Sequence, residues 1–276
     1  MPTELTLERH VAGLGEAMSA FVRYADRAGL DAAVPTCPDW TVRDLTAHQG
    51  MVHRWATSFL RGVRTSDPEA WERAGRAQTD PVAWLGAGAA ELARTIRQTP
   101  DDVRAPVFLN DAPRPRAFWA RRQCHETTMH AVDAQAAALG RTPDAVETSW
   151  IETEVAVDGI DELLAGFLTR PRERLRTEEE STLVVAPDDS GSWWVVSLGP
   201  RPALTSRGKG PLPDSDWLLT GTAVELYLRL WNRGPAPSLD ENDWRGLAAV
   251  TWSGGGSAEP TPAGQRKVSA MPRPRS

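Results

Sequence analysis

The sequence has few cysteines, no long apolar run and no excess of positive charge, and each absence excludes a class of protein. Only two of the 276 residues are cysteines, Cys37 and Cys124, which argues against a disulfide framework and fits a reducing compartment. No apolar stretch approaches the roughly 18 residues of a membrane-spanning helix. The net charge of −6 argues against nucleic acid or anionic membrane as the main partner.

The remaining composition is that of an ordinary globular chain. Hydrophobic residues make up 41% and charged residues 25%, which are typical values, and the length suits two hydrophobic cores better than one. The first ten residues carry charge and lack the apolar middle of a secretory signal, so we expect a cytoplasmic protein. Tryptophan is abundant, at 12 residues, and most of these side chains are expected in cores or clefts.

Apolar residues recur at helical spacing through the first half of the chain. Thr41, followed three residues later by Asp44, is typical of a capping box at a helix start. Four helices of this length favour a four-helix bundle. The expected helices cover residues 4–29, 41–62, 81–98 and 116–139.

The second half changes pattern and predicts a small α+β unit. We expect a helix over 147–168, then two strands that flank the turn at 188–192, a third strand around residues 201–206, and finally an amphipathic helix over 220–234. The fold class is therefore mainly α, a helical bundle followed by a small α+β domain. The predicted boundaries are 1–142 for the bundle, 143–252 for the α+β domain and 253–276 for a disordered Gly, Pro and Ser rich tail.

Helical geometry selects His48 from the five histidines as one that faces the bundle interior. It lies three residues after Leu45 and four before Val52, within the apolar stripe of its helix. His53 is five residues further along and is turned about 140° away, so it should not share that face.

On the fourth helix, Glu126 and His130 stand at i and i+4, with Asp133 further along the same face and His125 off it. Together with His48, Glu126 and His130 offer two imidazole nitrogens and one carboxylate oxygen, the donor set of a catalytic zinc site with an open position. Imidazole also suits iron, cobalt or nickel, so the identity of the metal stays open.

Other interpretations of these residues remain. A histidine on an apolar stripe is often a hydrogen-bonded core residue, and a Glu and a His at i, i+4 often form a surface pair. Spacing does not establish that the two helices are neighbours. A ligand set that includes His125 or Asp133 is also compatible with the sequence.

Three ordered segments resemble the mycothiol-dependent maleylpyruvate isomerase family. They are CPDWTVRDLTAHQGMVHRWA, HETTMHAVDAQAAALG and LLTGTAVELYLRLWNRG, and the likeness runs over about residues 5–252. Gln49 and Met51 depart from the small or apolar residues more usual in the first segment.

The resemblance implies a DinB-like four-helix bundle that binds zinc through His48, Glu126 and His130, the same trio that helix geometry selects. It also implies a C-terminal α+β domain that helps close the cleft and carries an essential arginine, matched here by Arg233. An alternative for Arg233 is a charge that complements the end of its helix.

The resemblance further implies mycothiol, a sugar-based thiol, as the cofactor. A metal-bound thiol loses its proton, and the thiolate then transfers to a small electrophile or catalyses its cis–trans isomerisation. We expect Arg233 to hold a substrate carboxylate and Asp133 to orient His130 or a water. The maleylpyruvate substrate is not carried over, and a monomer and a homodimer fit equally.

Two other functions are compatible with the sequence. One is a non-catalytic, small-molecule-binding protein of the same fold, against which the intact ligand trio argues. The other is a metal-dependent hydrolase with water in the open position, which lacks a clear separate general base because Glu126 is occupied as a ligand. Cys37 and Cys124 are expected to be structural.

Overall fold

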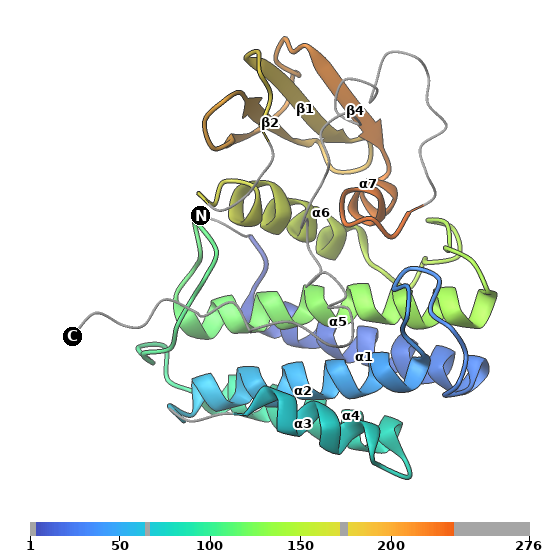
Figure 1. Ribbon diagram of the computed structural model, residues 1–276. Coiled ribbons are helices and arrows are strands. Elements are labelled where there is room, and N and C mark those ends of the chain that lie inside the picture. The colour runs from blue at the N-terminus through green and yellow to red at the C-terminus, as the bar shows by residue number, and fades with distance from the viewer. Residues whose placement is uncertain (1–3, 64–66, 172–175, 235–276) are drawn as a thin grey trace.

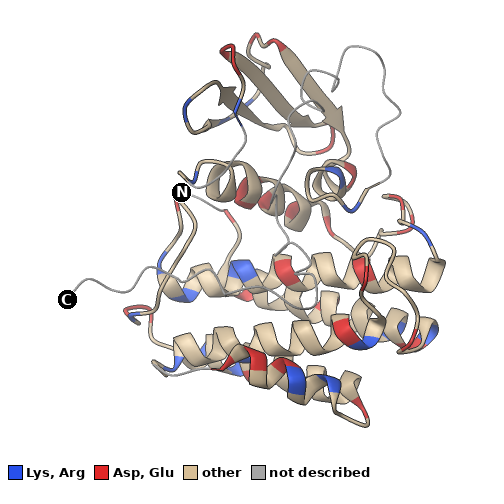
Figure 2. Cartoon of the chain, in the orientation of Figure 1, with Lys and Arg blue, Asp and Glu red and all other residues tan. Residues whose placement is uncertain are grey.

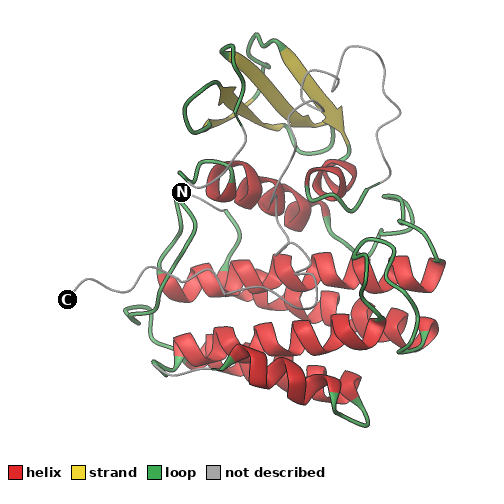
Figure 3. Ribbon diagram, in the orientation of Figure 1, coloured by secondary structure: helices red, strands yellow, loops and turns green. Residues whose placement is uncertain are grey.

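The computed structural model describes residues 4–63, 67–171 and 176–234. A helical bundle, a pair of helices and a small sheet are stacked in that order (Figures 1 and 3). The arrangement confirms the expected fold class, a four-helix bundle followed by a small α+β unit.

The bundle consists of four long helices, in which α1 packs along α5 and α2 packs along α4 (Figure 1). Their bounds are Leu7–Ala28 for α1, Val42–Leu60 for α2, Pro81–Gln98 for α4 and Pro115–Leu139 for α5. A short helix that we did not predict, α3 (Pro68–Arg76), lies against α2. It begins where Asp67 caps the backbone N–H of Ala70, and an Asp-Pro pair is a sequence signal for such a start.

The ends of the bundle helices follow the local chemistry of the sequence. The predicted capping box is present at α2, where Thr41 and Asp44 each satisfy a backbone N–H of the other. Helix α5 ends at Gly140, whose φ of 70° lies in the left-handed region that glycine adopts without strain.

The second part places two helical segments under a four-stranded sheet. Helix α6 (Thr153–Asp161) runs directly into a π-helical segment, η1 (Glu162–Phe167), and α7 (Ala223–Leu230) follows the last strand. The strand order is β3-β2-β1-β4, with β4 parallel to β1 and the other pairs antiparallel. The strands are β1 Ser181–Pro187, β2 Ser192–Leu198, β3 Leu204–Lys209 and β4 Trp217–Gly221.

Three details of this part differ from the sequence prediction. The helix expected from residue 147 begins at Thr153, because turns occupy the preceding residues. The third strand begins at Leu204 and not at residue 201. Strand β4 was not expected, because its apolar run is only three residues long and its partner β1 lies more than thirty residues away.

Two hydrophobic cores meet at α5. Trp119 belongs to the core inside the bundle, whereas Met129 and Val132 belong to the core shared with α6, α7 and the sheet. As a result, 18 of the 25 residues of α5 are buried, and this helix is covered on all sides.

Some expectations are not decided by this architecture. The boundary predicted at residue 142 stays a prediction, and the boundary predicted at 252 and the tail predicted over 253–276 lie outside the described residues. Among the residues that the structure describes, no helix has the length and apolarity needed to cross a membrane.

Gly159 provides a test of the packing between α6 and α7. A Cβ added there would lie 2.2 Å from Cε2 of Tyr227 and 2.9 Å from Nδ1 of His125, so we expect Gly159→Ala to lower the free energy of unfolding by about 1–3 kcal/mol. Gly86 of α4 is the matched control, because its added Cβ would meet nothing within 4 Å. Gly86→Ala should raise stability by up to about 1 kcal/mol. Urea denaturation of both variants measures the difference, and an equal effect of the two substitutions would contradict this packing.

Candidate metal centre

The structure brings His48, Glu126 and His130 together between α2 and α5. One ligand atom from each residue lies within 4.8 Å of the other two, and Nε2 of His130 is 3.4 Å from a carboxylate oxygen of Glu126. His130 is buried, whereas His48 and Glu126 are half-buried. The helices α2 and α5 are therefore neighbours, a point that the sequence spacing alone left open.

The indole of Trp40 covers the two imidazoles. Its ring centroid lies 4.9 Å from that of His48 and 6.3 Å from that of His130, which it stacks at 25°. Trp40 belongs to the loop just before α2, so the segment that starts this helix also limits the movement of both histidine rings.

Asp133 is the centre of a buried polar cluster beside His130. Its Oδ2 lies 2.8 Å from Nδ1 of His130, and the hydroxyl of Thr36 donates to Oδ1 at 2.6 Å. The guanidinium of Arg233 holds both carboxylate oxygens, at 2.8 and 3.2 Å, and the thiol of Cys37 lies 3.4 Å from Oδ2. Because Asp133 is fully buried, loss of the Arg233 charge would leave its carboxylate with fewer compensating partners, at a cost of several kcal/mol.

The electrostatics distinguish the two histidines. Desolvation and the neighbouring His130 lower the pKa of His48 to about 3, so its imidazole is neutral. Burial alone would lower the pKa of His130, but its hydrogen bonds to Asp133 and Glu126 raise that pKa to about 9. Without a metal, His130 therefore carries protons on both nitrogens at neutral pH, and a divalent ion would have to displace the proton from Nε2.

The carboxylate of Glu126 is kept ionised by an arginine on its own helix. Burial would raise the pKa of Glu126, but Arg122 and His130 outweigh burial and lower that pKa well below its usual range. Nη2 of Arg122 donates to Oε2 of Glu126 at 2.5 Å.

The donor set fits zinc. It combines two imidazoles with one ionised carboxylate, and such sets bind zinc with an open position for a further ligand. Nδ1 of His130 faces the carboxylate of Asp133, and a carboxylate is one of the groups that accept the second ring N–H of a metal-ligating histidine. Metal binding by His48, Glu126 and His130 stays a prediction that this geometry favours.

The remaining predicted site residues lie beside the trio. Asp133 faces His130, as expected for a residue that orients it. All three guanidinium nitrogens of Arg233 are engaged, by Asp133, by Cys37 and by the carbonyl of Trp231. A role for Arg233 in holding a substrate carboxylate stays a prediction, and these contacts favour a positioning role through Asp133.

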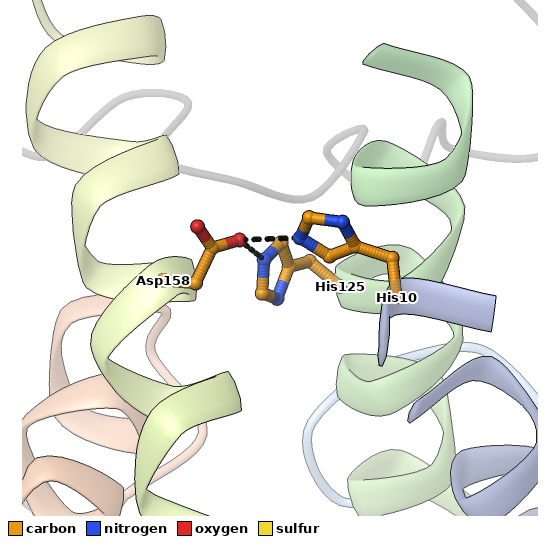
Figure 4. Close-up of side chains that lie close together, drawn as sticks. All are labelled: His10, His125 and Asp158. Carbon is orange, nitrogen blue, oxygen red and sulfur yellow. Dashed lines mark hydrogen bonds and ion pairs between the residues drawn. The ribbon is translucent and has the colours of Figure 1, made fainter. Parts of the chain in front are cut away.

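A second His and Asp group lies away from the trio, between α1, α5 and α6. Nε2 of His10 and Nε2 of His125 approach the same oxygen of Asp158, at 3.0 and 2.8 Å (Figure 4). Nε of Arg121 donates to that oxygen as well, at 2.9 Å. A cation there would have to compete with a buried guanidinium, so we interpret this group as a polar link between the two cores.

The other residues that sequence analysis set aside are buried. His53 contacts Gln49 and Thr127 at 2.8 and 2.9 Å. It belongs neither to the trio nor to the second group around Asp158. Burial raises the pKa of the thiols of Cys37 and Cys124, so neither is an activated nucleophile, as expected.

Sequence reasoning missed two residues of this site. Trp40 immediately precedes the capping residue of α2, and this position beside a helix start is the signal that the sequence offers. Arg122 stands four residues before Glu126, which is the spacing of an i, i+4 ion pair.

Comparison with known proteins relates both halves of the chain to one family. The model of the mycothiol maleylpyruvate isomerase (MDMPI) N-terminal domain matches residues 11–135, and that of the MDMPI C-terminal domain matches residues 154–256. A search of curated proteins gave no match.

Two solved structures share the fold. A crystal structure of the mycothiol-dependent maleylpyruvate isomerase is 15% identical, with a TM-score of 0.56 over 94% of this chain and 97% of that one. A histidine-to-alanine mutant of the mycothiol-dependent maleylpyruvate isomerase is 14% identical, with a TM-score of 0.56 over 84% of this chain and 91% of that one.

The proton on His130 can be measured directly. In metal-free protein we expect the His130 imidazole to titrate with a pKa of about 9, and Asp133→Asn should lower this pKa because the neutral amide no longer favours imidazolium. Nitrogen-15 NMR of labelled histidines follows the titration, and a His130→Gln variant assigns the signal. A His130 signal that titrates near 6.5 in both proteins would contradict the cluster.

Proposed function

The chain belongs to the mycothiol-dependent maleylpyruvate isomerase family, and from that premise we propose that it is an enzyme that activates the thiol of mycothiol with zinc. The zinc ligands in this proposal are His48, Glu126 and His130. The reacting partner is a small electrophile. The thiol either catalyses its cis–trans isomerisation or transfers its sulfur to it.

One observation supports this proposal above the others. The ligand atoms of the trio converge to within 4.8 Å of one another, although they come from two helices separated by residues 61–114. The group of His10, His125 and Asp158 has the same donor types, but there Arg121 donates to the carboxylate oxygen that both imidazoles approach. In the trio, Arg122 donates to Oε2 of Glu126, and His130 faces the other oxygen, Oε1.

The bound metal would supply a lowered thiol pKa, so that the thiolate is present at neutral pH. The chain provides the remaining requirements. Asp133 fixes the ring of His130 through Nδ1, Arg233 fixes Asp133, and Trp40 packs over both imidazoles. Each of these contacts restricts a ligand before any substrate arrives.

The thiolate has two productive outcomes. In isomerisation its sulfur adds to a conjugated carbon–carbon double bond, the electron pair moves to the conjugated oxygen, the former double bond rotates, and elimination of the thiolate restores the alkene. In S-transfer the sulfur displaces a leaving group, which departs with the bonding pair, and mycothiol is consumed. The fate of mycothiol therefore distinguishes an isomerase from a transferase.

The metal requirement predicts a zinc content of about one ion per purified chain. His48→Ala should lose most of this zinc because one of three ligands is removed. His53→Ala is the matched control, since His53 is the other histidine of α2 and contacts Gln49 and Thr127 instead of the trio. Elemental analysis measures all three proteins. The ligand assignment would be contradicted if the wild-type protein stays free of zinc after zinc is supplied. It would also be contradicted if both variants lose equal amounts of zinc.

The thiol requirement predicts turnover only when mycothiol is present. We expect the zinc-loaded protein to isomerise maleylpyruvate or to couple mycothiol to 1-chloro-2,4-dinitrobenzene, each followed by absorbance, and removal of zinc to abolish the activity. Turnover without thiol would instead indicate a metal-dependent hydrolase. A zinc-loaded protein that turns over neither probe would favour the non-catalytic binding protein.

A further inference from the structure

We propose that Arg122 is a positioning residue that leaves only one oxygen of Glu126 available to the metal and that couples the metal site to the C-terminal half of the chain. This inference rests on the proposed function, because it presupposes that Glu126 is a ligand. Glu126 and Arg122 lie one helical turn apart on α5.

The two oxygens of Glu126 have different neighbours. Oε2 accepts a hydrogen bond from Nη2 of Arg122 at 2.5 Å, whereas Oε1 faces Nε2 of His130 at 3.4 Å. Oε1 is thus directed toward His130, and Oε2 is occupied by a charged donor. A carboxylate without such a partner is free to ligate a metal through one oxygen or through both.

Arg122 is itself fixed by residues outside the bundle. It is 3% exposed, and its Nη1 donates to the buried carboxylate of Glu162. Its guanidinium lies 5.3 Å from the ring centroid of Phe167 and 5.1 Å from that of Trp231, distances at which a cation is attracted to an aromatic ring.

The π-helical segment η1 provides two of these three anchors. Glu162 is its first residue and Phe167 its last, and π-helical turns are frequent at functional sites because they alter which side chains share a face. The acidic residues of α6 and η1 accordingly lie over a basic stretch of α5 (Figure 2). Arginine suits this position better than lysine, because a planar guanidinium serves two carboxylates at once and still packs on aromatic faces.

A parallel connection reaches His130. Arg233 follows α7 and holds Asp133, which in turn holds His130. Both ligands on α5 are therefore positioned by an arginine that links them to the C-terminal half, Glu126 through Arg122 and His130 through Arg233.

The test compares Arg122→Met with Arg121→Met in the full chain. Arg121 is the matched control, because it is the adjacent arginine of α5, is also buried, and pairs with Asp158 and Asp161 instead of Glu126. The first readout is zinc affinity by competition with a chelating dye, and the second is the visible absorption of the cobalt(II)-substituted protein. Cobalt(II) absorbs more weakly as its coordination number rises.

We expect Arg122→Met to weaken zinc binding about 10- to 100-fold, the usual effect of losing a residue that orients a ligand. Its cobalt spectrum should weaken as the second Glu126 oxygen joins the metal. Arg121→Met should keep the wild-type affinity and spectrum. Should Arg122→Met fail to fold, Glu162→Gln gives the same readouts with a smaller loss, because it removes an anchor of Arg122 and leaves Glu126 unaltered.

Equal changes in the Arg121 and Arg122 variants would overturn the inference, since the effect would then be a general loss of stability. Unchanged zinc affinity and an unchanged cobalt spectrum in Arg122→Met would overturn the inference as well, and so would the same result in Glu162→Gln if that variant is used instead. In both cases zinc binding by the wild type would leave the proposed function intact. A wild type that binds neither zinc nor cobalt would refute the proposed function itself, and the inference with it.

Discussion

Helix α5 is covered on all sides, and each charged side chain buried in it must therefore be neutralised by a neighbour. An unpaired buried charge costs several kcal/mol, and α5 carries Arg121, Arg122 and Asp133 in its buried part. Their partners lie on α6, on η1 and after α7. The C-terminal half consequently does more than cover the bundle, because its charges determine how the polar residues of α5 are oriented.

This pairing determines how two residues of the candidate metal centre are oriented. His48 comes from α2, and Glu126 and His130 come from α5, so the bundle alone brings the trio together. The orientation of the two α5 ligands depends on Arg122 and on Asp133, which are paired with groups outside the bundle. A change in the packing of η1, or of the residues that follow α7, would thus reach the candidate metal centre through these charge pairs.

Much of the trio could be predicted from the sequence because helical periodicity sorts residues onto faces. The apolar stripe around Leu45 placed His48 inside the bundle, and the i, i+4 spacing joined Glu126 to His130. The capping box at Thr41 likewise depends on residues three positions apart. Each of these inferences uses local geometry, which the chain specifies within one or two helical turns.

The parts that escaped prediction depend on distant partners. Arg122 pairs with Glu162, which lies 40 positions further along the chain, and His10 contacts Asp158 across 148 positions. The π-helical turn at η1 and the short strand β4 depend on tertiary contacts more than on local pattern. The role of Arg233 was expected from a resemblance, and only its contacts indicate that it acts through Asp133.

Zinc-edge X-ray absorption of the wild-type protein, before and after addition of mycothiol, tests the central claim most directly. The account predicts only nitrogen and oxygen neighbours at about 2.0–2.2 Å without thiol, and a new sulfur neighbour at about 2.3 Å once mycothiol is present. An unchanged spectrum after saturation with mycothiol, or sulfur neighbours before its addition, would contradict a His48, Glu126 and His130 site that activates a thiol.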